Sequence, residues 1–115
     1  MIRLMNSNIM PAEGHYTLKK IDREEFCRML TDAYIAQNLE SYIGYKDNIM
    51  LIRKWTGITV RFSRENTILE DGDILLIMKL AKRIGDPAMK GIASFDEEDF
   101  EFYIAEYKAL EGGKR

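Results

Sequence analysis

The sequence predicts a small α/β (α+β) domain in which helices flank a buried β-sheet. Residues 74–78 are apolar at every position, as in a strand that is covered on both faces. Two segments, which begin near Asp22 and Asp47, repeat apolar residues at helical intervals. A chain of 115 residues is the size of one domain with a core of its own. We expect a single domain over residues 1–110 and a frayed tail over residues 111–115.

Two strands separated by a loop are predicted near the N-terminus. Residues 2–5 have the composition of a short strand, and residues 11–14 that of a loop. Residues 16–19 alternate between apolar and polar side chains, as a half-buried strand does. The single histidine, His15, falls in this loop region, and we interpret it as a bystander rather than an acid.

The first helix is predicted to follow Asp22. Asp22 and Glu25 have the spacing of a capping box, with the aspartate as the cap. Apolar residues then recur at helical intervals, namely Phe26, Met29, Leu30, Ala33 and Tyr34. Cys27 shares this apolar region, so it is interpreted as a core residue rather than a nucleophile.

A second helix is predicted from about Asp47 to Trp55, with Asp47 or Asn48 as its N-cap. Gly57 is placed to end it. Within this helix, Ile52 and Trp55 are expected to face the core.

The second half of the chain predicts further strands. Residues 58–62 are rich in β-branched side chains and alternate in polarity. A turn at Asp71-Gly72 separates residues 67–69 from the apolar run at 74–78. Residues 95–110 fit both a strand and a helix, and we favour a short helical turn followed by a strand.

Charge and composition exclude several classes of function. The chain carries 17 Lys and Arg against 19 Asp and Glu, and its net charge of −2 disfavours general binding to double-stranded DNA. No apolar stretch reaches membrane-spanning length, and the N-terminus lacks the pattern of a signal peptide. One cysteine fits a reducing compartment, so a soluble cytoplasmic protein is expected. One histidine and one cysteine do not supply a usual zinc site, and no metal or cofactor is predicted.

The segment before the second predicted helix has the features of an anion site. Free backbone N–H groups at a helix N-terminus attract phosphate, and Lys46 adds a positive charge there. Gly44 permits a close backbone approach or a positive φ, and Tyr45 offers a ring and a hydroxyl. The alternative is an ordinary capped helix with an exposed lysine.

Other polar residues fall at the predicted ends of strands. Asn6, Ser7 and Asn8 follow the first strand, Arg64 lies near the end of another, and Arg83 and Asp86 follow the central one. Ligands of open α/β sheets collect at the carboxyl ends of strands and the amino ends of helices. The alternative for the arginines is a solvated surface charge, and for Asp86, before Pro87, a turn residue.

Together these segments resemble the viral anti-CRISPR ring nucleases, a small family found in archaeal viruses, phages and mobile elements. The resemblance covers roughly residues 2 to 86 and depends on many weak motifs in a common order. These motifs are residues 4–11 (LMNSNIMP), Tyr16-Thr17, Ile21 with Glu25 and Phe26, residues 40–44 (ESYIG), Gly57-Ile58, Arg64, Gly72-Asp73 and residues 79–83 (KLAKR).

The resemblance implies a homodimer of subunits with a mixed β-sheet, here of about five strands, flanked by helices. It implies binding of cyclic tetra-adenylate, the second messenger of type III CRISPR defence, in a pocket across the dimer interface. Metal-independent cleavage of this messenger would occur in the host cytoplasm if the protein is viral. Lys46, Arg64 and Arg83 would neutralise its phosphates, and Asn6, Ser7 and Asn8 would help to position it.

The sequence departs from the family pattern at one important position. The pattern Ile-Gly-His supplies a histidine as the general acid for the 5′-oxygen leaving group, whereas this chain has Tyr45. A phenol, with an ordinary pKa of about 10, donates a proton at neutral pH less readily than an imidazolium, with an ordinary pKa of about 6.5. The family's glutamate falls on Asp86, which has a shorter reach. The resemblance thus makes Tyr45, Arg83 and Asp86 the candidate catalytic residues.

Three hypotheses follow. The first is a ring nuclease that uses the residues named above. The second is a non-catalytic sponge that sequesters a cyclic nucleotide in the same pocket, because the acid position holds Tyr45. The third is a small structural or transcriptional protein of a mobile element, which the acidic charge balance disfavours if it must grip DNA.

Overall fold

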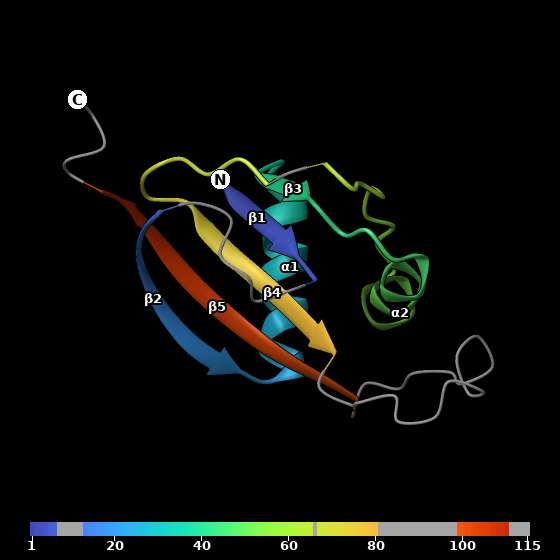
Figure 1. Cartoon of the computed structure of the whole chain (residues 1–115). Coiled ribbons are helices and arrows are strands. Elements are labelled where there is room, and N and C mark those ends of the chain that lie inside the picture. The colour runs from blue at the N-terminus through green and yellow to red at the C-terminus, as the bar shows by residue number, and fades with distance from the viewer. Residues whose placement is uncertain (7–12, 66, 81–98, 111–115) are drawn as a thin grey trace, which may run out of the picture.

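The fold was described from a computed structural model that defines residues 1–6, 13–65, 67–80 and 99–110. It contains a five-stranded sheet with the strand order β2-β5-β4-β1-β3, shown in Figure 1. The strands are β1 (Ile2–Met5), β2 (Gly14–Ile21), β3 (Leu39–Ser41), β4 (Ile74–Leu80) and β5 (Phe100–Ala109). β1 pairs in parallel with β3 and β4, whereas β5 is antiparallel to β2 and β4. The predicted α/β class with a mixed sheet is confirmed.

Both described helices, α1 (Arg23–Ile35) and α2 (Lys46–Thr56), pack on one face of the sheet. Figure 1 shows α1 crossing behind the strands and α2 lying beyond the end of β1. Side chains from both helices and the sheet share one core, which includes Leu4, Phe26, Leu30, Ile52, Leu76 and Met78. The opposite face has its own apolar cluster of Met5, Leu75, Ile77, Ala105 and Tyr107.

The prediction of a central buried strand is confirmed by β4. Its residues Leu75, Leu76, Ile77 and Met78 are all completely buried, because successive side chains enter the two clusters in turn. On the face away from the helices, Tyr16, Leu69 and Tyr103 pack against the cluster. The described helices thus cover only one face of β4, and side chains from strands and a loop bury the other.

Two of the three predicted helix ends are confirmed, and one is wrong. Asp22 caps α1, and its carboxylate accepts a hydrogen bond of 2.8 Å from the Glu25 N–H. Gly57 ends α2 with a φ of 78° and donates its N–H to the Arg53 carbonyl at 2.8 Å. The predicted N-caps of α2, Asp47 and Asn48, were wrong. Tyr45 is the N-cap and makes no side-chain capping bond, so Asp47 lies inside the first turn, where its charge still favours the helix dipole.

Two predicted strands are not formed. Residues 58–62 do alternate, with Ile58 and Val60 buried, but the segment makes only an isolated bridge between Phe62 and Ile43 within the described chain. Residues 67–69 also lack strand pairing. The turn at Asp71-Gly72 is confirmed, with φ 89° at Gly72. It does not close a hairpin, because β4 leaves it to pair in parallel with β1.

The remaining predictions concern the strands at the far side of the sheet. His15 lies within β2, opposite Lys108 of β5, and not in a loop. The strand interpretation of the last segment is confirmed by β5, although the helical turn predicted before it lies largely outside the described residues. Trp55 packs edge-on against Phe102 of β5 at 5.8 Å between ring centroids, and Ile52 is fully buried, as expected.

An ion-pair cluster around the buried Arg3 and Asp73, absent from the sequence-based predictions, lies near the amino ends of β1 and β4. Arg3 donates to Asp73 and to Glu40, both at 2.9 Å, and to Glu70 at 3.4 Å. The terminal amine of Met1 lies 3.6 Å from Asp73. Burial acts to raise the pKa of Asp73, but the hydrogen bonds from Glu70 and Arg3 and the nearby positive charges outweigh it and lower that pKa.

Candidate functional site

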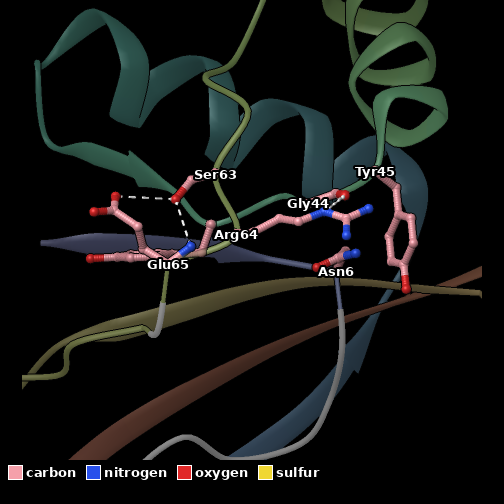
Figure 2. Close-up of a pocket in the computed structure, with 7 residues that line it drawn as sticks. Asn6, Gly44, Tyr45, Ser63, Arg64 and Glu65 are labelled. Carbon is pink, nitrogen blue, oxygen red and sulfur yellow. Dashed lines mark hydrogen bonds between the residues drawn. The ribbon is translucent and has the colours of Figure 1, made fainter.

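A pocket of about 260 Å³ lies at the carboxyl edge of the parallel strands. Its lining, drawn in Figure 2, consists of Asn6, Tyr42, Gly44, Tyr45, Ser63, Arg64 and Glu65. Asn6 directly follows β1, and residues 42–45 connect β3 to α2. This is the edge at which open α/β sheets bind their ligands.

Hydrogen bonds join the two segments that form the pocket, residues 41–43 and 61–63. The hydroxyl of Ser41 donates to the Arg61 carbonyl at 2.6 Å, and the N–H of Ser63 donates to the Ile43 carbonyl at 2.9 Å. Phe62 and Ile43 form the parallel bridge between these two contacts. The short extended segment that precedes Arg64 is thereby held beside the connection from β3 to α2.

Arg64 lies over this junction. Its Nε donates a hydrogen bond of 3.2 Å to the Gly44 carbonyl. The guanidinium carbon is 5.8 Å from the centroid of the Tyr45 ring and 5.9 Å from that of Phe62. A Cβ on Gly44 would come within 3.2 Å of Cγ of Arg64, so the glycine serves close approach rather than a positive φ.

The acidic residue in the pocket is directed away from this guanidinium. Glu65 accepts hydrogen bonds from Arg61 at 3.0 Å and from the Ser63 hydroxyl at 3.3 Å. Figure 2 shows its carboxylate on the opposite side of the backbone from the Arg64 guanidinium. No carboxylate in the described part of the chain forms an ion pair with Arg64, so its charge is available to an anion.

Asn6 supplies a neutral polar group to the same pocket. Its half-buried side chain lies beneath the Arg64 guanidinium in Figure 2. An amide can both donate and accept hydrogen bonds, whereas a guanidinium only donates and has a planar fork that matches two oxygens of a phosphate. The pair is suited to a phosphodiester with a polar sugar or base beside it.

Comparisons with known proteins place the chain in a family. Its sequence matches the STIV B116-like family over residues 2–104. The chain belongs to this family. Among structures, it is similar to B116 of Sulfolobus turreted icosahedral virus, with a TM-score of 0.72 and 20% sequence identity, over 90% of this chain and 97% of that one. At this identity the likeness shows a shared fold. No curated protein matches the sequence.

In this STIV B116-like protein the pocket unites four of the predicted site residues, namely Asn6, Gly44, Tyr45 and Arg64. Lys46 is exposed on the first turn of α2 and does not line the pocket. Ser7, Asn8, Arg83 and Asp86 lie outside the described residues. Their predicted roles therefore stay predictions.

Four residues at the site were not predicted, namely Tyr42, Phe62, Ser63 and Glu65. The alternation of residues 58–62 assigned Phe62 to a half-buried strand position, yet the side chain is 44% exposed and contacts Arg64. The only signal in the sequence was an aromatic residue two positions before an arginine, because the exposure of the ring depends on the fold.

Within residues 1–6, 13–65, 67–80 and 99–110, no helix is long and apolar enough to cross a membrane. No group of three or more histidine, cysteine or carboxylate side chains there is arranged to hold a metal ion.

Proposed function

We propose that this STIV B116-like protein binds a cyclic oligoadenylate, cyclic tetra-adenylate, and cleaves it to linear products, thereby countering type III CRISPR defence. The observation that carries the proposal is the Arg64 guanidinium, held by Gly44, Tyr45 and Phe62 and unpaired with any described carboxylate. The resemblance of the chain to the ring nucleases gives the proposal its substrate.

The size of the pocket supports a site completed by a second subunit. Ligand pockets usually measure about 300–1,000 Å³, and the 260 Å³ in one chain suits a single nucleotide rather than a ring of four. A two-fold homodimer would present two such pockets to a ligand that has rotational symmetry itself. One Arg64 from each subunit would then face phosphates on opposite sides of the ring.

The proposed reaction uses a nucleophile that belongs to the substrate. The ribose 2′-oxygen forms a bond to the adjacent phosphorus while the bond from phosphorus to the 5′-oxygen breaks. The 2′-hydroxyl loses a proton and the departing 5′-oxygen gains one, so the products are linear adenylates that end in a 2′,3′-cyclic phosphate. Arg64 would stabilise the negative charge that builds up on the phosphate oxygens.

The remaining roles follow from the resemblance. Tyr45 occupies the position of the family's general acid, and Asn6 would orient the ribose or the phosphate. Arg83 and Asp86 stay proposed members of the site, as do Ser7 and Asn8. General acid catalysis typically contributes about 10²–10⁴-fold, so a tyrosine in that position predicts slow turnover.

A single assay tests the proposal. The protein is mixed with radiolabelled cyclic tetra-adenylate, and both retention on the protein and the products are followed over time. Retention together with linear products ending in a 2′,3′-cyclic phosphate is expected. If the protein neither retains the labelled ligand nor forms product, the proposal is contradicted. The structural or transcriptional hypothesis would then remain.

A second candidate function is favoured by one observation, the absence of an imidazole from the described pocket. In this alternative the protein retains cyclic tetra-adenylate without cleaving it and must be present in stoichiometric excess. The Tyr45→His variant discriminates between the two, because a stronger acid should raise the cleavage rate. An unchanged or lower rate would show that Tyr45 does not occupy the acid position.

A further inference from the structure

We infer that Tyr45 and Phe62 form an aromatic clamp that positions the Arg64 guanidinium, and that Tyr45 aids ligand binding through its ring rather than its hydroxyl. This inference rests on the proposed function for the identity of the ligand. For the binding step it makes Tyr45 and Phe62 positioning residues, which act on the ligand through Arg64. The acid role proposed for the Tyr45 hydroxyl belongs to the cleavage step and is tested separately.

The exposure of the two rings is the first argument. Tyr45 is 61% exposed and Phe62 is 44% exposed, although each ring would gain from burial. Both rings lie within 6 Å of the same guanidinium carbon, the distance at which cation–π attraction operates. They come from segments 17 residues apart that the Phe62–Ile43 bridge brings together.

The backbone completes the clamp. The Gly44 carbonyl accepts the Nε hydrogen bond, and the absence of a Cβ on Gly44 lets the Arg64 stem lie against it. Figure 2 shows the side chain extended from Ser63 toward Tyr45, with its terminal nitrogens beyond Gly44. One anchor on Nε and two rings thus restrict a side chain that otherwise has many rotamers.

An aromatic clamp differs in its consequence from a carboxylate partner. A carboxylate would orient the guanidinium but would also neutralise it and occupy its N–H groups. Aromatic rings attract the cation through their faces and leave the terminal N–H groups in the guanidinium plane available. Glu65, the carboxylate beside Arg64 in sequence, is bound instead by Arg61 and Ser63. The clamp therefore presents an oriented and fully charged group to a phosphate.

The Tyr45 hydroxyl makes no hydrogen bond to any other described residue. In Figure 2 the ring stands beside the guanidinium, with the hydroxyl at its far end. The contact that the structure provides for Tyr45 is therefore made by the ring. Removal of the hydroxyl alone should leave the clamp intact.

The test measures equilibrium binding of 2′-O-methyl cyclic tetra-adenylate, which lacks the attacking hydroxyl and stays intact. Tyr45→Leu and Phe62→Leu should each weaken binding by about 3- to 5-fold, the amount expected for one exposed cation–π contact. Tyr45→Phe and Phe62→Tyr keep the rings and should bind within about 2-fold of the unsubstituted protein. A loss in Tyr45→Phe equal to that in Tyr45→Leu would overturn the inference.

A double-mutant cycle separates an action through Arg64 from direct stacking on the ligand. If the ring acts through Arg64, Tyr45→Leu should cost nothing further in an Arg64→Met background. Additive losses would mean that the ring contacts the ligand itself, and would contradict the clamp. Thermal unfolding of each variant checks that the fold persists.

A measurement without ligand keeps this inference distinct from the proposed function. The exchange of the Arg64 Nε–H proton with water can be followed by NMR, with its signal assigned from its loss in Arg64→Lys. Exchange should accelerate in Tyr45→Leu and stay unchanged in Tyr45→Phe. Unchanged exchange in both would refute the clamp, whereas failure of the unsubstituted protein to retain the cyclic nucleotide would refute the proposed function.

Discussion

Arg3 and Arg64 lie at opposite ends of the parallel strands, and their surroundings differ in what they leave for a ligand. Arg3 is 5% exposed and bonds to Asp73, Glu40 and Glu70. Arg64 is exposed and is held by one carbonyl and two rings. The positive charge of Arg3 is balanced by three carboxylates, whereas no carboxylate in the described part of the chain balances that of Arg64.

This difference shows how one residue type serves two purposes in a small sheet. A buried guanidinium must be paired, because an unpaired buried charge is very costly. A guanidinium at the rim of a pocket can be oriented by groups that do not neutralise it, and it then favours an anion. We therefore expect the Arg3 end of the strands to contribute to stability, and we propose that the Arg64 end binds the ligand.

The comparison predicts its largest effect on stability at Arg3. Arg3→Met leaves the buried Asp73 carboxylate without its main partner, so the free energy of unfolding should fall by about 3–5 kcal/mol. The matched control, Arg64→Met, should cost less than about 1 kcal/mol, since Arg64 is exposed. Denaturation in urea measures both, and equal losses would remove the distinction between the two ends.

Binding should show the reverse order. Arg64→Met keeps most of the side-chain length but removes the charge, and should weaken binding of 2′-O-methyl cyclic tetra-adenylate by about 10- to 100-fold. Arg53→Met is the control, because Arg53 is an exposed arginine on α2 that does not line the pocket. Titration of both variants should separate them, and similar losses would indicate only a general effect of surface charge.

A smaller effect is expected in the pH dependence of stability. The lowered pKa of Asp73 means that its contribution is fully present above the unfolded-state pKa of about 3.9 and is lost as the pH falls through the folded-state value. Unfolding free energies at about pH 6 and about pH 3 should thus differ more in the unsubstituted protein than in Asp73→Asn. Parallel profiles would mean that Asp73 is not ionised and paired as described.

The smallest effects should distinguish two glycines. Gly57 adopts a left-handed φ of 78° in open space, so Gly57→Ala should reduce stability by about 1 kcal/mol without changing binding. Gly44→Ala places a Cβ against the Arg64 stem and should weaken binding by about 2- to 5-fold with little loss of stability. Urea denaturation and ligand titration of both variants measure these effects. A loss of binding in Gly57→Ala, or a loss of stability without a loss of binding in Gly44→Ala, would contradict the prediction.

Local signals in the sequence predicted the elements whose causes are local. The Asp22 and Glu25 spacing gave the start of α1, Gly57 gave the end of α2, and the apolar run predicted β4. Residues 58–62 misled because alternation indicates a half-buried extended chain, but a ladder also needs an adjacent strand. In the described structure this segment has no adjacent strand and forms only the bridge to Ile43.

The two arginine sites were predictable to different degrees. Gly44, Tyr45 and Arg64 could be grouped because each falls at the end of a predicted element, where α/β folds place ligands. The Arg3 cluster could not, since Glu40 and Asp73 lie 37 and 70 residues away in the sequence. The exposure of Phe62 could not be predicted either, because it depends on the bridge between Phe62 and Ile43, which are distant in the sequence.

Binding of a cyclic oligoadenylate in the pocket around Arg64 can be followed at both arginines in one experiment. The ¹⁵N–¹H signals of the Arg3 and Arg64 side chains are followed by NMR during titration with 2′-O-methyl cyclic tetra-adenylate. We predict that the Arg64 Nε–H signal shifts and saturates at a stoichiometric ratio while that of Arg3 stays in place. An Arg64 signal that does not respond to saturating ligand would contradict binding in this pocket.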